Sequence, residues 1–171
     1  MKPGDHPDFF RLPPPEGRSR ESTIVLDAEG RFFHDGAAVT HPGMAKAFAS
    51  WITRHPDDGR FILNNGYDWS YFRVEDAPFQ VVSLAFPPAE ASAPPLLELS
   101  DGSSEQLDPV KLRIGEQGAL YVEVKSGAFE ARFSRAAQLG LAPFLSEEAD
   151  GSLSLDFGRQ RVRLPVSARK A

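Results

Sequence analysis

The sequence predicts an α+β protein that consists of two duplicated units, each an antiparallel sheet with a helix. Three observations support this fold class. The chain has 14 glycines and 15 prolines among its 171 residues, which indicates many turns and few long helices. Short apolar and alternating runs are separated by Asn-Gly and Asp-Gly dipeptides, which is the pattern of β-hairpins. A segment of the first half is also echoed fifty residues later.

Composition narrows the class of protein. The chain has no cysteine, so disulfides, thiolate zinc sites and cysteine nucleophiles are excluded and a reducing compartment is favoured. The net charge is -5, so the chain lacks the overall positive charge that is typical of proteins that bind DNA or RNA. A local site for a small anion is still compatible with this charge. No apolar run reaches the length of a signal peptide or a membrane helix. We therefore expect a soluble, cytoplasmic protein with no membrane partner.

The chain divides into four predicted segments. Residues 1–21 contain five prolines and predict an extended N-terminal arm. Residues 22–88 predict the first α+β half, and residues 96–171 predict a second, β-rich half. Between them lies a Pro/Ala-rich stretch, residues 89–95, which we expect to be the linker.

One helix is expected in the first half, beginning near Pro42 and ending before Pro56. Thr40 or His41 can cap its first turn. Apolar side chains recur at i, i+4, i+7 and i+8, the stripe of an amphipathic helix, in Met44, Phe48, Trp51 and Ile52.

After this helix the pattern predicts three successive antiparallel strands, at residues 60–64, 68–75 and 79–86. Asn65 and Gly66 form the strongest turn signal in the chain. The second turn is expected at Asp76 to Pro78, with Asp76 accepting backbone hydrogen bonds and Pro78 placed where no ladder N–H is needed.

The second half is predicted to contain a hairpin around Asp101-Gly102 and strands at 110–114, 119–125 and 128–134. A second helix is expected at 135–145 and a closing hairpin at 152–164. At an offset of fifty residues the halves align without a gap, and the identical or matched pairs are Tyr71 with Tyr121, Val74 with Val124, and Phe79 with Phe129.

Strand alternation singles out one candidate binding face. Phe72 and Val74 point to one side of their strand, whereas Trp69, Tyr71 and Arg73 point to the other. The rings can simply cover a neighbouring strand or the other half of the protein. Alternatively they form a stacking surface for a planar ligand, with Arg73 supplying charge. Tyr121 occupies the matching place in the second half.

Arginines provide a second set of candidates. Arg132 and Arg135 lie at a strand-to-helix junction, where the start of a helix would add N–H donors for an anion. Arg159, Arg161 and Arg163 alternate on one strand, with Arg169 and Lys170 beyond. We interpret this second group as the charged outer face of an edge strand rather than as a phosphate site.

Motifs of catalysis and metal binding are missing from the sequence. The four histidines show no metal-ligand spacing, so we predict no metal site and no cofactor. No nucleophile motif occurs, and an enzyme is not predicted. A hydrolase would require His34 or His41 to meet a serine and a carboxylate.

Four segments resemble the family known as domain of unknown function 1285: EGRFFHDGAAV, the helical AFASWI, VEDAPF, and YVEVKSGAFEARFSRAAQL. VEDAPF is the most specific of them, and Phe32 departs from the tryptophan usual in that family. The resemblance implies a duplicated α+β fold whose second half is a pleckstrin-homology-like sheet. It also implies a ligand site between the halves and a signalling role without enzymatic activity. His34 and Arg135 match family positions and are implied contacts.

Two functions follow as hypotheses. In the first, the protein is a non-enzymatic binding or regulatory protein that holds a small ligand, such as a nucleotide, between its halves. Its ligand-binding residues are then Trp69, Tyr71, Arg73, Tyr121, Arg135 and His34. In the second, it is an adaptor that docks a protein partner through the Trp69/Tyr71 face and the N-terminal arm. The adaptor hypothesis predicts that Trp69→Ala abolishes partner binding without changing the melting temperature.

Overall fold

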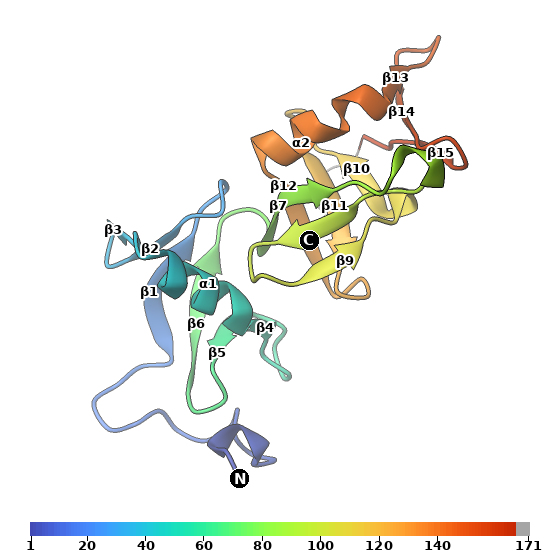
Figure 1. Cartoon of the computed structure of the whole chain (residues 1–171). Coiled ribbons are helices and arrows are strands. Elements are labelled where there is room, and N and C mark those ends of the chain that lie inside the picture. Colours follow the sequence, from blue (N-terminus) through green and yellow to red (C-terminus); the bar gives the residue numbers. More distant parts are fainter. Residues whose placement is uncertain (167–171) are drawn as a thin grey trace. The chain divides into compact units, whose positions relative to one another are not determined.

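The structure, a computed structural model, describes residues 1–166. The chain forms two compact units that divide between Pro78 and Phe79. Both are mostly sheet, and two short helices complete an α+β protein (Figure 1). The division differs from the one expected at residues 89–95, because that stretch lies inside the second unit and connects two of its strands. No helix among residues 1–166 is long and apolar enough to cross a membrane.

The first unit is one six-stranded sheet with a helix on one face. Its strand order is β3-β2-β1-β6-β5-β4, and the two central strands, β1 and β6, run parallel. In chain order the elements are η1 (Pro3–Asp5), β1 (Glu21–Leu26), β2 (Phe32–His34), β3 (Ala37–Ala38), α1 (Pro42–Trp51), β4 (Ile52–Arg54), β5 (Phe61–Asn64) and β6 (Trp69–Val74).

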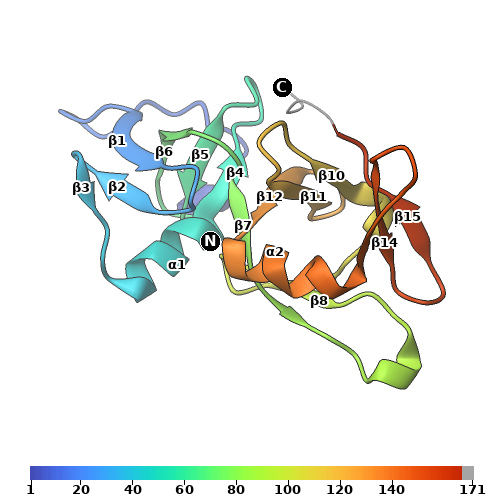
Figure 2. The same cartoon turned by 90° about the horizontal axis from the view of Figure 1, so that it is seen from above.

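The second unit contains a six-stranded sheet, order β10-β11-β12-β7-β8-β9, and a three-stranded sheet, β13-β14-β15 (Figure 2). Helix α2 packs against β7 and β12. In chain order the elements are β7 (Phe79–Ala85), η2 (Ala89–Ala91), β8 (Leu96–Leu99), β9 (Ser104–Gln106), η3 (Pro109–Lys111), β10 (Leu112–Ile114), β11 (Leu120–Val124), β12 (Phe129–Phe133), α2 (Arg135–Leu141), η4 (Ala142–Phe144), β13 (Leu145–Glu147), β14 (Leu153–Asp156) and β15 (Arg161–Arg163).

The two large sheets have the same strand order. Numbered from the first strand of each unit, both read 3-2-1-6-5-4, and in both the central pair is parallel. By this order β6 corresponds to β12, and β5 corresponds to β11. The offset of fifty residues is therefore wrong as an alignment, because it matches Tyr71 of β6 with Tyr121 of β11. Apolar and polar residues alternate in any amphipathic hairpin, so two such hairpins can be aligned at many offsets. Alternation alone therefore does not identify the correct offset.

Helix α1 confirms the first predicted helix. The His41 side chain accepts a hydrogen bond from the Met44 N–H, and Pro42 stands in the first turn. Phe48 packs against Phe32 of β2, with ring centroids 5.4 Å apart. The predicted apolar stripe is wrong at both ends, because Met44 is 50% exposed and Ile52 is the first residue of β4 rather than part of the helix.

The predicted run of three antiparallel strands is correct only for its first pair. β5 and β6 are antiparallel, and the Asn65 carboxamide oxygen accepts N–H bonds from Tyr67 and Asp68, both 2.9 Å, in the predicted turn. Gly66 has a φ of 83°, which favours glycine. β7 belongs instead to the other sheet and pairs in parallel with β12. Phe79 and Val81 are fully buried there, so β7 contributes to the core of the second unit.

Predicted turns and boundaries in the second unit are mostly confirmed. The hairpins at Asp101-Gly102 and at residues 152–164 are present as β8–β9 and β14–β15. Helix α2 ends at Leu141, earlier than expected, because Pro143 enters the 3-10 turn that follows it. Asp76 and Pro78 lie in the bend between β6 and β7.

The β8–β9 turn should make stability depend on pH through Asp101. Burial raises the pKa of this carboxyl, but hydrogen bonds from Lys125 Nζ (2.7 Å) and from Ser103 outweigh burial and hold the pKa below its ordinary value. A lowered folded-state pKa stabilises the fold above the unfolded pKa, and this contribution is lost as the pH falls through the folded value. Asp101→Asn should therefore lose roughly 1–2 kcal/mol at neutral pH and progressively less in acid.

The measurement is the urea midpoint of wild type and variant across the acid range. Exposed Glu116 offers a control, since Glu116→Gln should leave the midpoint nearly unchanged at every pH. A difference between wild type and Asp101→Asn that persists in strong acid would contradict a role for the ionised carboxylate.

Candidate functional site

The predicted site residues lie in both units. Trp69, Tyr71 and Arg73 are on β6, and His34 ends β2. Tyr121 is on β11, and Arg135 begins α2. Of the first four, only Trp69 and Tyr71 come together, with ring centroids 5.2 Å apart.

Arg73 and His34 have local carboxylate partners. Arg73 Nη2 lies 3.2 Å from Glu75 Oε1, and His34 Nε2 lies 3.6 Å from Asp35 Oδ2. His41 is occupied in capping α1. Among the hydrogen bonds of residues 1–166, neither His34 nor His41 bonds a serine hydroxyl, the arrangement that a hydrolase would need.

The N-terminal arm covers the face that carries Trp69. We call this surface the Trp69 face and define it by Ile62, Trp69 and Tyr71, which point away from the α1 side of the sheet. Phe9 and Ile62 are buried with Trp69 in one apolar cluster, and Phe10 packs against it. Trp69 is only 5% exposed. Residues 3–12 are therefore a compact docked segment rather than the extended arm expected from the prolines.

His55 is part of this cluster, although its sequence context does not mark it. The imidazole is buried, and its ring centroid lies 4.9 Å from that of Trp69, 5.6 Å from Tyr71 and 5.7 Å from Phe10. Nδ1 accepts the Asp57 N–H at 3.2 Å, so Nε2 carries the proton that is donated to the Phe10 carbonyl at 3.3 Å. Both ring nitrogens of His55 are therefore engaged by main-chain groups.

Hydrogen bonds to the main chain of the arm and an ion pair with one of its side chains also fix the arm on the sheet. The Trp69 indole N–H donates to the Phe9 carbonyl at 3.3 Å, and the Gly4 N–H donates to the Gly66 carbonyl at 2.9 Å. Arg11 forms a two-bond pair with Asp57, through Nε at 3.1 Å and Nη2 at 2.8 Å. The arm is recognised through carbonyl groups, ring contacts and a charge pair, without joining the sheet as a strand.

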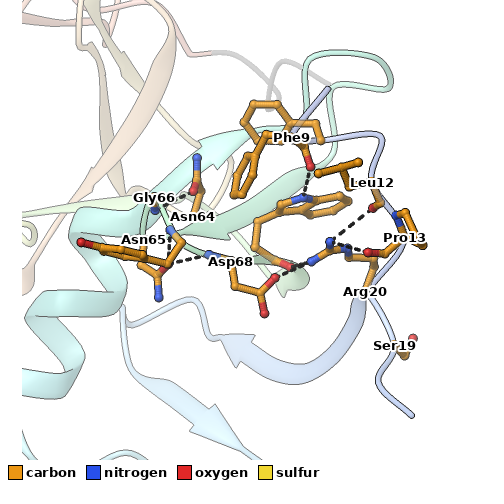
Figure 3. A network of polar contacts seen from close by, with 12 residues as sticks. Phe9, Leu12, Pro13, Ser19, Arg20, Asn64, Asn65, Gly66 and Asp68 are labelled. Carbon is orange, nitrogen blue, oxygen red and sulfur yellow. Dashed lines mark hydrogen bonds and ion pairs between the residues drawn. The ribbon is translucent and has the colours of Figure 1, made fainter. Parts of the chain in front are cut away.

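Arg20 joins the end of the docked arm to the turn between β5 and β6 (Figure 3). Its Nη1 donates to Asp68 at 2.5 Å and to the Trp69 carbonyl at 2.9 Å. Its Nη2 reaches the Leu12 and Pro13 carbonyls, both at 3.3 Å. The guanidinium carbon lies 4.4 Å from the Trp69 ring centroid, a cation–π contact. One arginine therefore covers Trp69 and ties the arm to the turn.

Tyr71 is engaged by neighbouring polar groups. Its hydroxyl donates to Asp58 at 2.6 Å, which raises the pKa of Tyr71 and lowers the pKa of Asp58. The Arg60 guanidinium lies 3.7 Å from the Tyr71 ring centroid and forms a two-bond pair with Glu21. While the arm is docked, both rings of the proposed stacking surface are in contact with groups of the chain itself.

In the second unit, Tyr121 lies beside a buried ion pair. Arg113 Nε and Nη2 contact the Glu130 carboxylate at 2.8 and 2.5 Å, and the Arg113 guanidinium stands 4.0 Å from the Tyr121 ring centroid. Arg113 is 7% exposed. No local sequence pattern marks this pair, because Arg113 and Glu130 are 17 residues apart and meet only across β11.

Arg135 lies at a hollow of about 340 Å³ in the same unit. The wall includes Arg132 at the end of β12 and Gln138 on α2. Gln138 fixes α2 to the β10–β11 turn, since its side chain accepts from the Leu120 N–H at 3.0 Å and donates to the Gly118 carbonyl at 2.8 Å. The complete lining is Gln117, Gly118, Ala119, Arg132, Phe133, Arg135, Gln138 and Leu139.

The charge of this hollow has one sign. Its lining holds two arginines and no acidic side chain, in a chain of net charge -5. Arg135 is exposed, and within residues 1–166 it forms no ion pair. At the start of α2 the Ser134 hydroxyl accepts the Ala137 N–H at 3.1 Å, so this one donor of the first turn is already used.

The arginines of β15 are neutralised. Arg161 contacts Glu148 at 2.6 Å, and Arg163 contacts Asp150. A shallow hollow of about 550 Å³ beside them is therefore lined by both charge signs. This agrees with the interpretation of β15 as a charged edge strand, whereas Arg169 and Lys170 lie outside the described residues. In residues 1–166 no group of three or more His, Asp or Glu side chains is placed to hold a metal ion.

Comparison with known proteins links the chain to one fold. No protein-family model and no curated protein matches the sequence. A DUF1285 family protein from Silicibacter pomeroyi DSS-3 matches with a TM-score of 0.63 at 23% identity, over 86% of this chain and 81% of that chain. A DUF1285 family protein from Shewanella baltica OS155 matches with a TM-score of 0.56 at 20% identity, over 73% of this chain and 94% of that chain. The resemblance found in the sequence is thus confirmed at the level of the fold: this chain has the fold of DUF1285 family proteins.

Proposed function

We propose that this protein is a non-enzymatic binding protein with a regulatory role, and that it holds a small phosphate-bearing ligand, such as a nucleotide, at the hollow around Arg135. The observation that carries the proposal is the lining of this hollow, with two guanidinium groups and no carboxylate. The proposed site lies within the second unit, where Arg135 is the one predicted ligand residue that lines the hollow.

The shape and polarity of the hollow suit a small amphipathic anion. A volume of about 340 Å³ lies at the lower end of the range for small-molecule sites. Guanidinium groups bind phosphate oxygens in a two-bond geometry. Ala119, Phe133 and Leu139 supply an apolar wall on which a base or sugar could rest. The Gln138 contacts hold α2 and the β10–β11 turn together, so the two sides of the site are pre-arranged.

Replacing Arg135 should weaken ligand binding without unfolding the protein. Arg135→Gln removes one charge from an exposed side chain, so the melting temperature should stay within about a degree of wild type. The loss of one charge-assisted contact should lower the affinity about ten-fold or more. Isothermal titration calorimetry against inorganic phosphate, mononucleotides and cyclic nucleotides would measure this change.

Arg159→Gln is the matched control, because it removes the same charge from an exposed position of the same unit. Binding should also weaken with added salt, since the contact between Arg135 and the phosphate is ionic. Equal affinities for Arg135→Gln and Arg159→Gln would contradict the assignment. If wild type binds no member of the panel and native mass spectrometry shows only bare protein, the small-anion function is wrong.

We further infer that the chain is a divergent DUF1285 member that arose by duplication and has a pleckstrin-homology-like second unit. Support comes from the VEDAPF segment, the shared strand order of the two sheets and the helix that follows the last strand of the second sheet. A duplication would require the two units to be aligned so that β1 corresponds to β7 and β6 corresponds to β12.

A further inference from the structure

Residues 8–11 lie on the Trp69 face as a bound peptide would. Two consecutive rings, Phe9 and Phe10, pack on Trp69, and side chains of the body bond the carbonyls of both residues. Side-chain anchors combined with main-chain contacts are the usual basis of peptide recognition. The segment adds no strand to the sheet of the first unit. Side chains and not strand pairing therefore hold it in place.

The rim of this surface complements a basic segment. Asp57 pairs with Arg11, and the adjacent Asp58 has a side chain that is 39% exposed. At the other end of β5, Asp68 is 46% exposed and pairs with Arg20. On the arm, Lys2 lies over the Tyr67 ring at 5.7 Å. An apolar centre with an acidic rim selects aromatic side chains followed by a positive charge.

The tether between the docked segment and β1 has little structure of its own. Residues 12–19 include three consecutive prolines and are exposed except for Pro14. Arg20 holds the start of this tether through the Leu12 and Pro13 carbonyls. A segment on such a tether competes with a free peptide at an effective concentration of about millimolar.

We propose that the Trp69 face, together with His55 and Asp57, is a docking surface for a linear segment of a partner protein that carries two consecutive aromatic residues followed by arginine. Residues 8–11 are the resident occupant, and a partner segment exchanges with them. This inference is independent of the anion site, because every residue that carries it lies in the first unit.

The probe is a fluorescently labelled peptide with the sequence of residues 1–14, titrated into the full-length chain and followed by anisotropy. In Arg11→Glu the resident segment meets Asp57 with like charge, and Arg11 is an exposed side chain, so the fold should persist. The labelled peptide should bind this variant at least about ten-fold more tightly than wild type, because the resident competitor is weakened. Gly4→Ala should act in the same direction, since an added Cβ would lie 2.9 Å from the Gly66 carbonyl oxygen.

Two controls test the chemistry of recognition. A peptide with Phe9→Ala and Phe10→Ala should lose binding, and a peptide with Arg11→Glu should regain affinity on a chain that carries Asp57→Arg. The proposal is overturned if the wild-type peptide fails to bind either Arg11→Glu or Gly4→Ala while both keep the native circular-dichroism spectrum. It is also overturned if the peptide without rings binds equally well. If wild type self-associates and the peptide dissociates the oligomer, the occupant of the surface is the arm of a second copy. That result would exclude a different partner protein.

Discussion

Trp69→Ala is expected to lower the free energy of unfolding by about 3–5 kcal/mol, the usual cost of truncating a buried aromatic side chain. Trp69 is 5% exposed and contacts Phe10, His55 and Tyr71 as well as the Arg20 guanidinium. The substitution also removes the indole donor from the Phe9 carbonyl, so the arm loses its central contact. The adaptor hypothesis expected an unchanged melting temperature, which does not fit a side chain in the core of the first unit.

Chemical denaturation followed by circular dichroism measures this effect. Tyr67→Ala is the control, because Tyr67 is a large aromatic residue two positions earlier and is 62% exposed. Its truncation should cost no more than about 0.5 kcal/mol. If the two variants have the same denaturation midpoint, the arm does not cover Trp69 in solution.

Glu130→Ala is expected to destabilise the protein by roughly 3–5 kcal/mol, because it takes the carboxylate partner from a buried arginine. The Arg113 side chain is 9% exposed and that of Glu130 19%, so water can replace the lost contacts only in part. Removing one member of a buried pair costs more than the pair itself contributes, since the desolvated charge stays behind. Glu130→Gln should cost less, because it keeps the shape and one acceptor oxygen.

A two-bond pair that is much more exposed provides the control. Arg60 and Glu21 also form two bonds, and their side chains are 51% and 61% exposed. Glu21→Gln should therefore change the free energy of unfolding by no more than about 1 kcal/mol. Comparable losses for Glu130→Ala and Glu21→Gln in thermal denaturation would contradict the burial of the Arg113–Glu130 pair.

Local signals predicted much of the secondary structure. Helix α1 follows from the spacing of Phe48 and Trp51 and from Pro42, and the hairpin turns follow from Asp-Gly and Asn-Gly dipeptides. These features depend on residues that are close in sequence, so the sequence contains the information needed. The fold could also be recognised from the sequence, because VEDAPF and three other segments resemble the DUF1285 family.

The pairing of strands that are distant in the sequence could not be predicted from such local signals. β1 pairs with β6, and β7 pairs with β12, both in parallel and both about fifty residues apart in the chain. Alternation predicts which side chains share a face but not which strand lies beside them. For the same reason residues 89–95 suggested a domain linker, although they lie between the antiparallel strands β7 and β8 of one sheet.

The Trp69 face shows both sides of this division. Sequence by itself determined that Trp69 and Tyr71 point to the side opposite Phe72, because side chains alternate along any strand. Only the tertiary structure decided that Phe9, Phe10 and His55 cover them, because the burial of apolar surface is not directional and any ring that the chain can bring there serves. In the same way, Arg135 could be identified from its position after a strand. The hollow that it lines is formed in part by residues 117–119, which are distant in sequence and to which Gln138 ties α2.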